Sequence, residues 1–305
     1  MLTQRRWIVL VCVMGVGLGL GFCVWQSNRP KSASAVVRQS DFQRIVSLSP
    51  SITECLFALG LGHRVVGVTN YCDYPAEALT KAKVGGYYDL SYEAVVALDP
   101  DLVIGLPSHE DKLADLEALG LSLLILDLQR VDTILASIET LGRVSGVPEP
   151  ADRLVVGIRQ RMAAVKARAI NAQRPRVMIT ASRQLDSDRI DEIYIAGKGG
   201  FYDEMIVLAG GINAYQGDLP YPKLSGEGIL RLRPDMVLDM VPDLAIKGIS
   251  EASVLQQWAS VPGLAAHEQG RVKLFTEDFV VIPGPRFIDT LEKMAEAIHP
   301  EGTKL

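Results

Sequence analysis

The stretch LSYEAVVALDPDLV, residues 90–103, returns at residues 224–237 of this 305-residue chain as LSGEGILRLRPDMV. In each copy, a serine that can cap a helix start is followed two residues later by a glutamate that suits the positive end of the helix dipole. Apolar residues then follow at helical spacing, Pro-Asp breaks the helix, and an apolar run predicts a buried strand. A helix-break-strand unit that recurs at the distance of a whole domain predicts two similar lobes. The copies lie 134 positions apart without a gap and share seven of their fourteen residues, namely Leu90/Leu224, Ser91/Ser225, Glu93/Glu227, Leu98/Leu232, Pro100/Pro234, Asp101/Asp235 and Val103/Val237.

The composition indicates a folded, acidic body long enough for two domains. Hydrophobic residues make up 48% of the chain, which excludes disorder over most of its length. The whole chain has a formal net charge of −5, but residues 1–35 carry four basic and no acidic residues, so the remainder has 27 basic against 36 acidic residues, a net of −9. An acidic body argues against a nucleic-acid partner and against binding to anionic lipid by charge.

The first 35 residues have the pattern of an export signal. Arg5 and Arg6 precede an uninterrupted apolar run from Trp7 to Trp25, and Ala33-Ser34-Ala35 matches a small-x-small cleavage site. The run is also long enough to span a bilayer, so residues 7–25 could instead remain as an uncleaved membrane anchor. Either alternative predicts a periplasmic body, outside the cytoplasmic membrane.

Strands alternating with helices across short loops predict an α/β fold of two lobes with mostly parallel sheets, joined by one long rigid helix. The first lobe is assigned to residues 36–148. The connecting helix, residues 149–173, would be a strut of roughly 35 Å. The second lobe is assigned to residues 174–305, and its polar stretch 182–192 is expected to be a surface loop.

Two cysteines, Cys55 and Cys72, lie outside the export segment. They could form a disulfide in an oxidising compartment. Cys55, however, lies in an apolar helical pattern, where a buried free thiol is the commoner outcome. The sequence therefore favours two free thiols.

Enzymatic motifs are scarce along the chain. It contains no GxxxxGK[ST], GxSxG, HExxH or CxxC motif. Its four histidines are dispersed singly, whereas a transition-metal site needs clustered ligands. His109 follows the end of a predicted strand, near a plausible cleft, yet we expect it not to bind metal. The sequence therefore predicts a binding protein without catalytic residues, cofactor or metal.

Aromatic residues gather in the loops and helix starts beside predicted strand ends. In open α/β sheets, ligands bind beyond the carboxyl ends of the strands. Two facing lobes would then form a cleft lined by tyrosines, which suits a large, flat or ring-rich ligand. Any single tyrosine is about as well explained as a core or turn residue. The residues concerned are Tyr71, Tyr74, Tyr87, Tyr88, Tyr194, Phe201, Tyr215 and Tyr221.

Glu93 and Glu227 occupy the same position in the two copies of the repeat. Complementarity to the helix dipole at an exposed first turn would explain each of them without further function. Alternatively, two exposed carboxylates, one per lobe, could dock onto two arginines of a two-fold symmetric partner.

Five stretches together resemble the periplasmic substrate-binding proteins of ABC importers for cobalamin, haem and ferric siderophores, and among these the cobalamin binders. The resemblance covers about residues 44–301. It implies two α/β lobes bridged by one long helix that open and close little on binding. The stretches are LSPSITE (48–54), TNYCDYP (69–75), SYEAVVALDPDLVI (91–104), LPYPKLSGE (219–227) and PGPRFIDTLEKMAEAIHPE (283–301).

The resemblance also implies roles for single residues. Glu93 and Glu227 match the two lobe-tip glutamates that pair with arginines of the permease dimer. Tyr71 matches a cleft residue. Tyr87 and Tyr221 replace tryptophans of the cobalamin binders, and Tyr194 stands roughly where they carry a phenylalanine. Tyr88 and Arg286 complete the residues expected to contact the ligand.

The leading hypothesis is therefore a protein that captures a corrinoid and presents it to an ABC permease dimer driven by cytoplasmic ATPase subunits. The alternative within the same importer group is a ferric-siderophore or haem binder. A siderophore site should add a basic or hydrogen-bonding cluster in the cleft, for which Arg183 and Arg286 are the candidates. An alternative of another class is a membrane-anchored sensory or enzymatic domain that reuses this fold.

Overall fold

The computed structural model describes residues 42–87, 89–169, 172–242 and 244–300. All of them belong to one compact unit, Val37–Leu305. The expected export segment and Tyr88 lie outside the described residues. Within the described ranges, no helix combines the length and the apolar character needed to span a bilayer.

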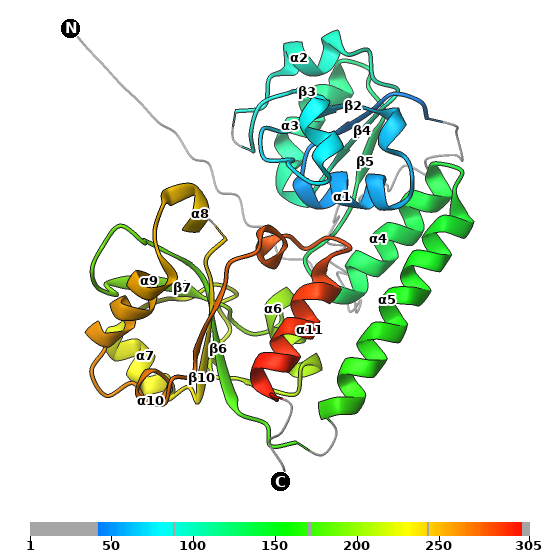
Figure 1. Ribbon diagram of the computed structural model, residues 1–305. Coiled ribbons are helices and arrows are strands. Elements are labelled where there is room, and N and C mark those ends of the chain that lie inside the picture. The colour runs from blue at the N-terminus through cyan, green and yellow to red at the C-terminus, as the bar shows by residue number, and fades with distance from the viewer. Residues whose placement is uncertain (1–41, 88, 170–171, 243, 301–305) are drawn as a thin grey trace, which may run out of the picture. The chain divides into compact units, whose positions relative to one another are not determined.

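The first lobe is built on a five-stranded parallel sheet in the order β3-β2-β1-β4-β5 (Figure 1). Side chains alternate between its two faces, because successive residues of a strand point in opposite directions. Ile45 and Leu102 join the core on one face, whereas Val46 and Val103 join a separate cluster on the other. The elements are β1 (Ile45–Ser47), α1 (Pro50–Ala58), β2 (Val65–Val68), β3 (Ala82–Lys83), α2 (Tyr92–Ala97), β4 (Leu102–Gly105), α3 (Glu110–Ala118) and β5 (Leu123–Ile125).

The second lobe contains a six-stranded mixed sheet in the order β11-β10-β6-β7-β9, with β8 also paired to β6. Strands β6, β8, β10 and β11 run parallel, whereas β7 and β9 are antiparallel to their neighbours. The strands are β6 (Arg176–Arg183), β7 (Glu192–Ile195), β8 (Ile212–Asn213), β9 (Lys223–Ser225), β10 (Met236–Met240) and β11 (Val272–Phe275). The helices are α6 (Phe201–Leu208), α7 (Gly226–Leu232), α8 (Leu244–Lys247), α9 (Glu251–Gln257) and α10 (Ala265–Glu268).

Strand β6 corrects the expected loop at 182–192. The strand continues through Arg183, and β7 resumes at Glu192 as its antiparallel partner, so the surface loop is shorter than predicted. The reason is a buried partner for the arginine: the Arg183 guanidinium lies 2.9 Å from Asp239 on β10. Short 3₁₀ helices complete the described structure at Gly62–Arg64, Ala76–Thr80, Pro107–His109, Trp258–Ser260 and Asp278–Val281.

Three helices connect the lobes: α4 (Val131–Val144), α5 (Pro148–Ala169) and α11 (Phe287–Ile298). Figure 1 shows α4 and α11 packed along the predicted strut, α5. The strut has 22 residues, which corresponds to about 33 Å. It begins at Pro148, slightly before the expected start, because prolines in a first turn lose no intrahelical hydrogen bond.

Two segments carry the chain between the lobes. The first crossover, residues 126–130, leads from β5 to α4, and the second crossover, residues 276–286, leads from β11 to α11. One continuous hydrophobic core runs from the first sheet to the second through the helices that these crossovers introduce. Its buried members on α1, α4, α5, α6 and α11 include Ile52, Ile134, Val155, Met205 and Leu291.

The two copies of the repeat share their local structure as well as their sequence. In each, the Pro-Asp carboxylate accepts the backbone N–H of the arginine at the start of the lobe's first buried strand: Asp101 Oδ1 lies 2.9 Å from Arg44 N, just before β1, and Asp235 Oδ2 lies 2.7 Å from Arg176 N, the first residue of β6. The guanidinium groups of Arg44 and Arg176 in turn donate to the last carbonyls of the repeat's helices, Leu98 O and Leu232 O. This equivalence confirms the predicted duplication.

The two serines of the repeat differ. Ser91 Oγ accepts the Ala94 N–H at 3.2 Å and caps α2 as expected. Ser225 precedes α7 but its side chain makes no capping hydrogen bond, so this expectation was wrong. Ser225 is the last residue of β9 and pairs with Glu192 across the sheet, which gives its backbone a more extended conformation than that of Ser91.

Cys55 and Cys72 are both buried free thiols, as the sequence favours. Burial raises the pKa of the Cys55 thiol well above its usual range. Thr53 and Thr69 place their hydroxyl oxygens 3.2 and 3.1 Å from the Cys72 sulfur. Cys72 is thereby held in polar contacts with two threonines within the first lobe.

Candidate functional site

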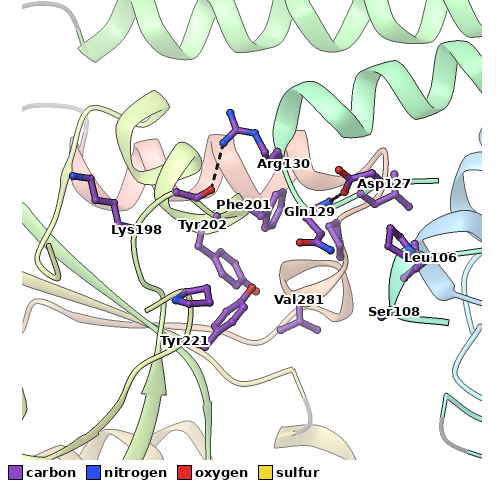
Figure 2. A pocket seen from close by; sticks show the side chains of 16 residues that line it. Leu106, Ser108, Asp127, Gln129, Arg130, Lys198, Phe201, Tyr202, Tyr221 and Val281 are labelled. Atoms are coloured by element: carbon purple, nitrogen blue, oxygen red, sulfur yellow. Dashed lines mark hydrogen bonds between the residues drawn. The ribbon is translucent and has the colours of Figure 1, made fainter. Parts of the chain in front are cut away.

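A pocket of about 370 Å³ opens between the two lobes (Figure 2). The first lobe contributes residues 106–108 and 127–130, which follow β4 and β5 at the carboxyl end of the sheet, where ligands bind in open α/β folds. The second lobe contributes the start of α6 and the turn before β9, and the second crossover closes one side. The lining residues are Leu106, Pro107, Ser108, Asp127, Leu128, Gln129, Arg130, Lys198, Gly199, Gly200, Phe201, Tyr202, Pro220, Tyr221, Val281 and Pro283.

The aromatic wall of the pocket is formed by Phe201, Tyr202 and Tyr221. The Tyr202 hydroxyl donates to Val280 O at 2.9 Å, so it is already committed within the protein. Burial raises the pKa of both tyrosines, which keeps their phenols protonated at neutral pH. Tyr221 remains 53% exposed and presents its ring to the pocket. This wall can pack against a ring system, with the Tyr221 hydroxyl available for a hydrogen bond.

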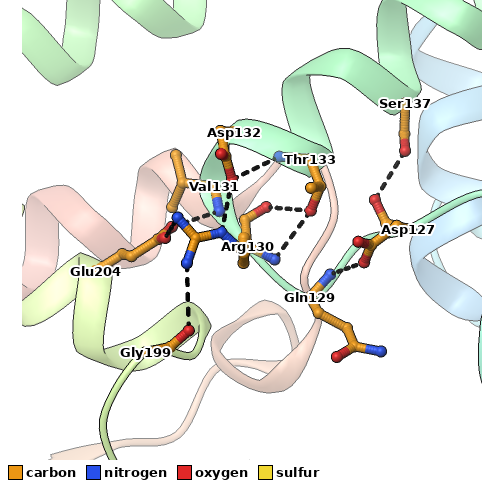
Figure 3. Close-up of polar contacts among 9 residues, drawn as sticks. All are labelled: Asp127, Gln129, Arg130, Val131, Asp132, Thr133, Ser137, Gly199 and Glu204. Atoms are coloured by element: carbon orange, nitrogen blue, oxygen red, sulfur yellow. Dashed lines mark hydrogen bonds and ion pairs between the residues drawn. The ribbon is translucent and has the colours of Figure 1, made fainter. Parts of the chain in front are cut away.

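The polar side of the pocket is held by a network on the first crossover (Figure 3). Arg130 lies 2.5 Å from Glu204 of α6 and 3.1 Å from Asp132, and it donates to Gly199 O at 3.4 Å. Asp127 accepts the Gln129 N–H at 2.9 Å through its carboxylate, and its carbonyl accepts the Ser137 hydroxyl at 2.8 Å. The Gln129 amide therefore projects from a fixed backbone into the pocket, able to donate and accept hydrogen bonds.

Of the tyrosines that were expected to contact the ligand and that the structure describes, only Tyr221 lines this pocket. Tyr71 lies on an exposed loop, and Tyr194 lies on β7 with a Lys223 ammonium 5.9 Å from its ring. Tyr87 stacks on the buried His109 at 4.8 Å between ring centroids. Tyr88 lies outside the described residues.

His109 does not line the pocket but holds one of the segments that do. Its Nδ1 accepts the Leu106 N–H at 3.1 Å, which pins the start of the pocket segment 106–108. Burial lowers the pKa of His109, so the ring is neutral with its proton on Nε2. Among the residues described, no group of His, Cys, Asp and Glu could hold a metal ion.

Arg286 does not line the pocket, although it was expected to contact the ligand. Its guanidinium lies 2.5 Å from Glu54 of α1 and 2.8 Å from Asp278, and it stacks 3.6 Å from the centre of the Tyr74 ring. A guanidinium with two carboxylate partners and an aromatic ring is satisfied by the protein itself. The local sequence PGPRF does not reveal this, because Glu54 lies 232 positions away.

Arg183, the other candidate for a siderophore site, is removed from solvent altogether. Its side chain is 1% exposed and pairs with Asp239, while Gln257 Oε1 accepts from its Nη1 at 2.5 Å. The Trp258 indole N–H also donates to Asp239, at 2.9 Å. The expected role of Arg183 in a cleft is therefore wrong, because this network lies in the interior of the second lobe.

Glu93 and Glu227 both lie exposed in the first turns of their helices, α2 and α7. Glu93 accepts the Ser91 hydroxyl at 3.2 Å. Glu227 is 84% exposed at its side chain and lies 3.6 Å from Arg231, one turn along the helix. Neither carboxylate is held in the interior, so both are accessible to a partner.

Sequence reasoning missed the polar pocket residues Asp127, Gln129, Arg130 and Lys198. A usable signal was present for the first three, because they follow the apolar run at residues 123–126, which contains β5, and the strand-end rule applies to them as it does to the tyrosine loops. No such sequence signal was present for Lys198, because its distance from the pocket depends on how the second lobe packs.

Comparison with known proteins places the chain in a family. Its sequence matches the periplasmic binding protein family over residues 45–278. The chain belongs to this family. A relative in Bacillus subtilis, the uncharacterised ABC transporter substrate-binding lipoprotein YvrC, is 31% identical over 272 residues, which cover 86% of this chain and 82% of that protein.

Two solved structures of periplasmic binding proteins have the same fold. The vitamin B12-binding protein BtuF of Vibrio cholerae gives a TM-score of 0.72 at 26% identity and covers 87% of this chain and 99% of its own. The haem-binding protein RhuT of Roseiflexus sp. RS-1 gives a TM-score of 0.72 at 30% identity and covers 84% of this chain and 98% of its own. These relatives are binding proteins. The chain is accordingly a substrate-binding protein of the ABC importer type that acts in the cell envelope with a permease and its ATPase.

Proposed function

We propose that this periplasmic binding protein captures a corrinoid in the pocket between its lobes and delivers it to the permease. The observation that carries the proposal is the aromatic wall of Phe201, Tyr202 and Tyr221 facing the side-chain amide of Gln129, whose backbone is held by Asp127. A corrin ring offers apolar faces for stacking and amide groups at its rim for hydrogen bonds, and both kinds of partner are present here. The similarity to a vitamin B12-binding protein supports the same ligand class.

A haem or ferric-siderophore ligand is the second candidate, favoured by the similarity to the haem-binding protein RhuT. The aromatic wall would also accept a porphyrin. Against it, the Arg130 guanidinium is already neutralised by Glu204 and Asp132, which weakens its attraction for the carboxylates of haem. Lys198 is then the principal free cation among the described pocket residues. A doubly charged ligand, by contrast, favours a pocket with several cationic side chains.

Glu93 and Glu227 are proposed as the two docking points for the permease dimer. Their equivalent positions in the duplicated units and their exposure support this role. Each would meet one arginine of a two-fold symmetric partner. A further part of the proposal is that residues 7–25 tether the protein. The alternative is cleavage after Ala35, and a mass measurement of the exported protein would decide between the two.

The identity of the ligand is tested by titration of the protein purified from the cell envelope. Isothermal calorimetry with cyanocobalamin, haem and a ferric siderophore should show saturable heat with cyanocobalamin at the lowest ligand concentration. Saturation by haem or siderophore with no response to cyanocobalamin would replace the corrinoid by the second candidate. The absorption spectrum of the purified protein provides an independent check, since each of these ligands is coloured.

A further inference from the structure

Two ion pairs cross between the lobes in opposite directions. Arg130, the last residue of the first crossover, reaches Glu204 on α6 of the second lobe, with Nη2 and Oε1 2.5 Å apart. Arg286, the last residue of the second crossover, reaches Glu54 on α1 of the first lobe through two hydrogen bonds of 2.5 and 3.0 Å. Each lobe thus sends an arginine to the other, and we call the two contacts the lobe clamps.

The lobe clamps are related by the duplication of the chain. Glu54 and Glu204 each lie six residues before a glycine, Gly60 and Gly210, that ends the helix with a positive φ of 77° and 85°. Each arginine occupies the position just before a helix, α4 or α11. Equivalent residues on equivalent elements therefore form both contacts, which a chance pair of surface charges would not do.

Each clamp is held by more than its central ion pair. The second carboxylate oxygen of Glu204 accepts the backbone N–H of Val131 at 2.8 Å, so the glutamate also binds the first residue of α4. Asp132 and Asp278 give the two arginines a second carboxylate, at 3.1 and 2.8 Å.

The second clamp is closely packed. A side chain on Gly284 would bring its Cβ within 3.1 Å of Glu54 Oε2, so the crossover lies directly against α1. The Glu54 side chain is 2% exposed and that of Arg286 is 14% exposed. Such a pair contributes little net stability, because desolvation offsets the attraction, but it strongly restricts geometry.

The first clamp joins the two walls of the pocket. Arg130 and Gln129 belong to the wall from the first crossover, and Gly199 and Phe201 belong to the wall at the start of α6. Glu204 lies one turn into the same helix and holds Arg130. This contact therefore spans the pocket from one wall to the other, and the second clamp joins the same two lobes at α1.

We propose that Glu204 and Glu54 are positioning residues of the ligand pocket, which act through Arg130 and Arg286 to hold the lobes at one separation with or without ligand. The consequence for affinity rests on the proposed binding function, whereas the consequence for lobe separation does not. The two consequences are therefore measured separately.

Lobe separation is measured by electron–electron double resonance between spin labels at Leu119→Cys and Ile246→Cys, two exposed positions on different lobes. Cys12 and Cys23 are replaced by serine in this chain, and Cys55 and Cys72 are fully buried. The parent protein should give a narrow distance distribution without ligand. Glu54→Gln combined with Glu204→Gln should broaden it about twofold, because both clamps lose their charge.

The matched control is Glu139→Gln. It removes a glutamate that lies 3.1 Å from Arg159, an exposed Arg–Glu pair between α4 and α5 that does not join the lobes. Its distance distribution should equal that of the parent. An unchanged distribution in the double variant, or equal broadening in the control, would overturn the proposal. Glu204→Gln alone gives the same test at the more exposed clamp, should the double variant fail to fold.

Affinity for cyanocobalamin is measured on the same proteins. The double variant should bind about tenfold more weakly, because only a fraction of the molecules holds the walls at the binding distance. Parent affinity in a variant with a broadened distribution would overturn the positioning role. Absence of binding by the parent itself to cyanocobalamin and to haem would refute the proposed function, and the distance distributions would still decide on the clamps.

Discussion

Asp99 and Arg233 lie 134 positions apart and share the same left-handed backbone, with φ of 45° at both. Each follows the helix of its repeat, Asp99 one residue after the C-cap and Arg233 as the C-cap itself, and turns the chain into the Pro-Asp that precedes the next strand. A residue with a side chain loses about 1–2 kcal/mol in this conformation relative to the right-handed one. Its presence in both lobes shows that the turn itself was kept through the duplication while the residue type diverged.

Arg233→Gly should raise the free energy of unfolding by about 0.5–1 kcal/mol, because glycine adopts positive φ without the clash of a Cβ, at some cost in unfolded-state entropy. Arg231→Gly is the control, since it places glycine in the helix α7 and should lower stability by about 1 kcal/mol. Urea denaturation of both variants measures the difference. A destabilised Arg233→Gly would show that the side chain matters more than the turn.

Asp239→Ala should destabilise the second lobe by about 3–5 kcal/mol, because it leaves the Arg183 guanidinium buried without a carboxylate. The Trp258 indole N–H loses its acceptor at the same time. Asp191→Ala, which removes the partner of Arg189 in a pair with side chains 72% and 57% exposed, should change stability by less than about 0.5 kcal/mol. Thermal denaturation followed by circular dichroism distinguishes the two, and similar melting temperatures would contradict the burial of Arg183.

Tyr221→Ala should weaken binding of the pocket ligand about tenfold, since it removes one ring of the aromatic wall. Tyr221→Phe should lose less, because it keeps the ring and removes only the hydroxyl. Tyr194→Ala provides the comparison outside the pocket and should leave the dissociation constant nearly unchanged. A loss at Tyr194 equal to that at Tyr221 would extend the binding site to β7. Calorimetry with the ligand identified above supplies all three values.

Glu93→Ala combined with Glu227→Ala should abolish uptake of the ligand by cells while the purified protein keeps its affinity. Both side chains lie at exposed helix starts outside the pocket, so their loss removes charge for a partner and leaves the ligand contacts intact. Glu117→Ala, an exposed carboxylate in the last turn of α3, serves as the control and should retain uptake. Weakened ligand affinity in the double variant would place these residues in the binding site.

The loss of unfolding free energy at acid pH should depend on Glu292. The Arg161 guanidinium beside it lowers the pKa of this carboxyl below the usual range. The unfolded chain therefore takes up the proton at a higher pH than the folded protein does. The contribution is present above about pH 4.5 and is lost as the pH falls through the folded-state pKa.

Glu292→Gln should accordingly show a shallower loss of unfolding free energy between about pH 5 and pH 3 than the parent. Glu296→Gln removes an exposed carboxylate from the same helix and should keep the parent slope. Chemical denaturation at fixed pH steps measures both. A Glu292→Gln slope equal to that of the parent would show that the ion pair with Arg161 makes no pH-dependent contribution.

The duplicated architecture was predictable because it follows from patterns within short stretches of the sequence. The repeat at 90–103 and 224–237, the apolar strands and the 22-residue strut α5 each have a periodicity that short-range physics determines. The family resemblance rested on the same stretches. These features were confirmed with boundary shifts of a few residues.

The pocket was predictable only in outline. Tyr221 lies where the strand-end rule expects ligand contacts, whereas Arg286 and Arg183 are taken up by carboxylates far away in sequence. The sequence around an arginine in a loop does not distinguish an arginine that faces a ligand from one that pairs with a buried carboxylate. The distinction depends on tertiary packing, which also determines that Gln129 and Lys198 meet in one pocket.

One hydrophobic core passes from the first sheet through α4, α5 and α11 to the second sheet. This continuity determines how the protein unfolds. Each lobe also has a smaller cluster on the other face of its sheet, but the shared core covers one face of both sheets and would be exposed if either half were removed. Heating should therefore produce one calorimetric transition in place of two, with equal calorimetric and van't Hoff enthalpies. Despite its two lobes, the protein should therefore unfold as a single cooperative unit.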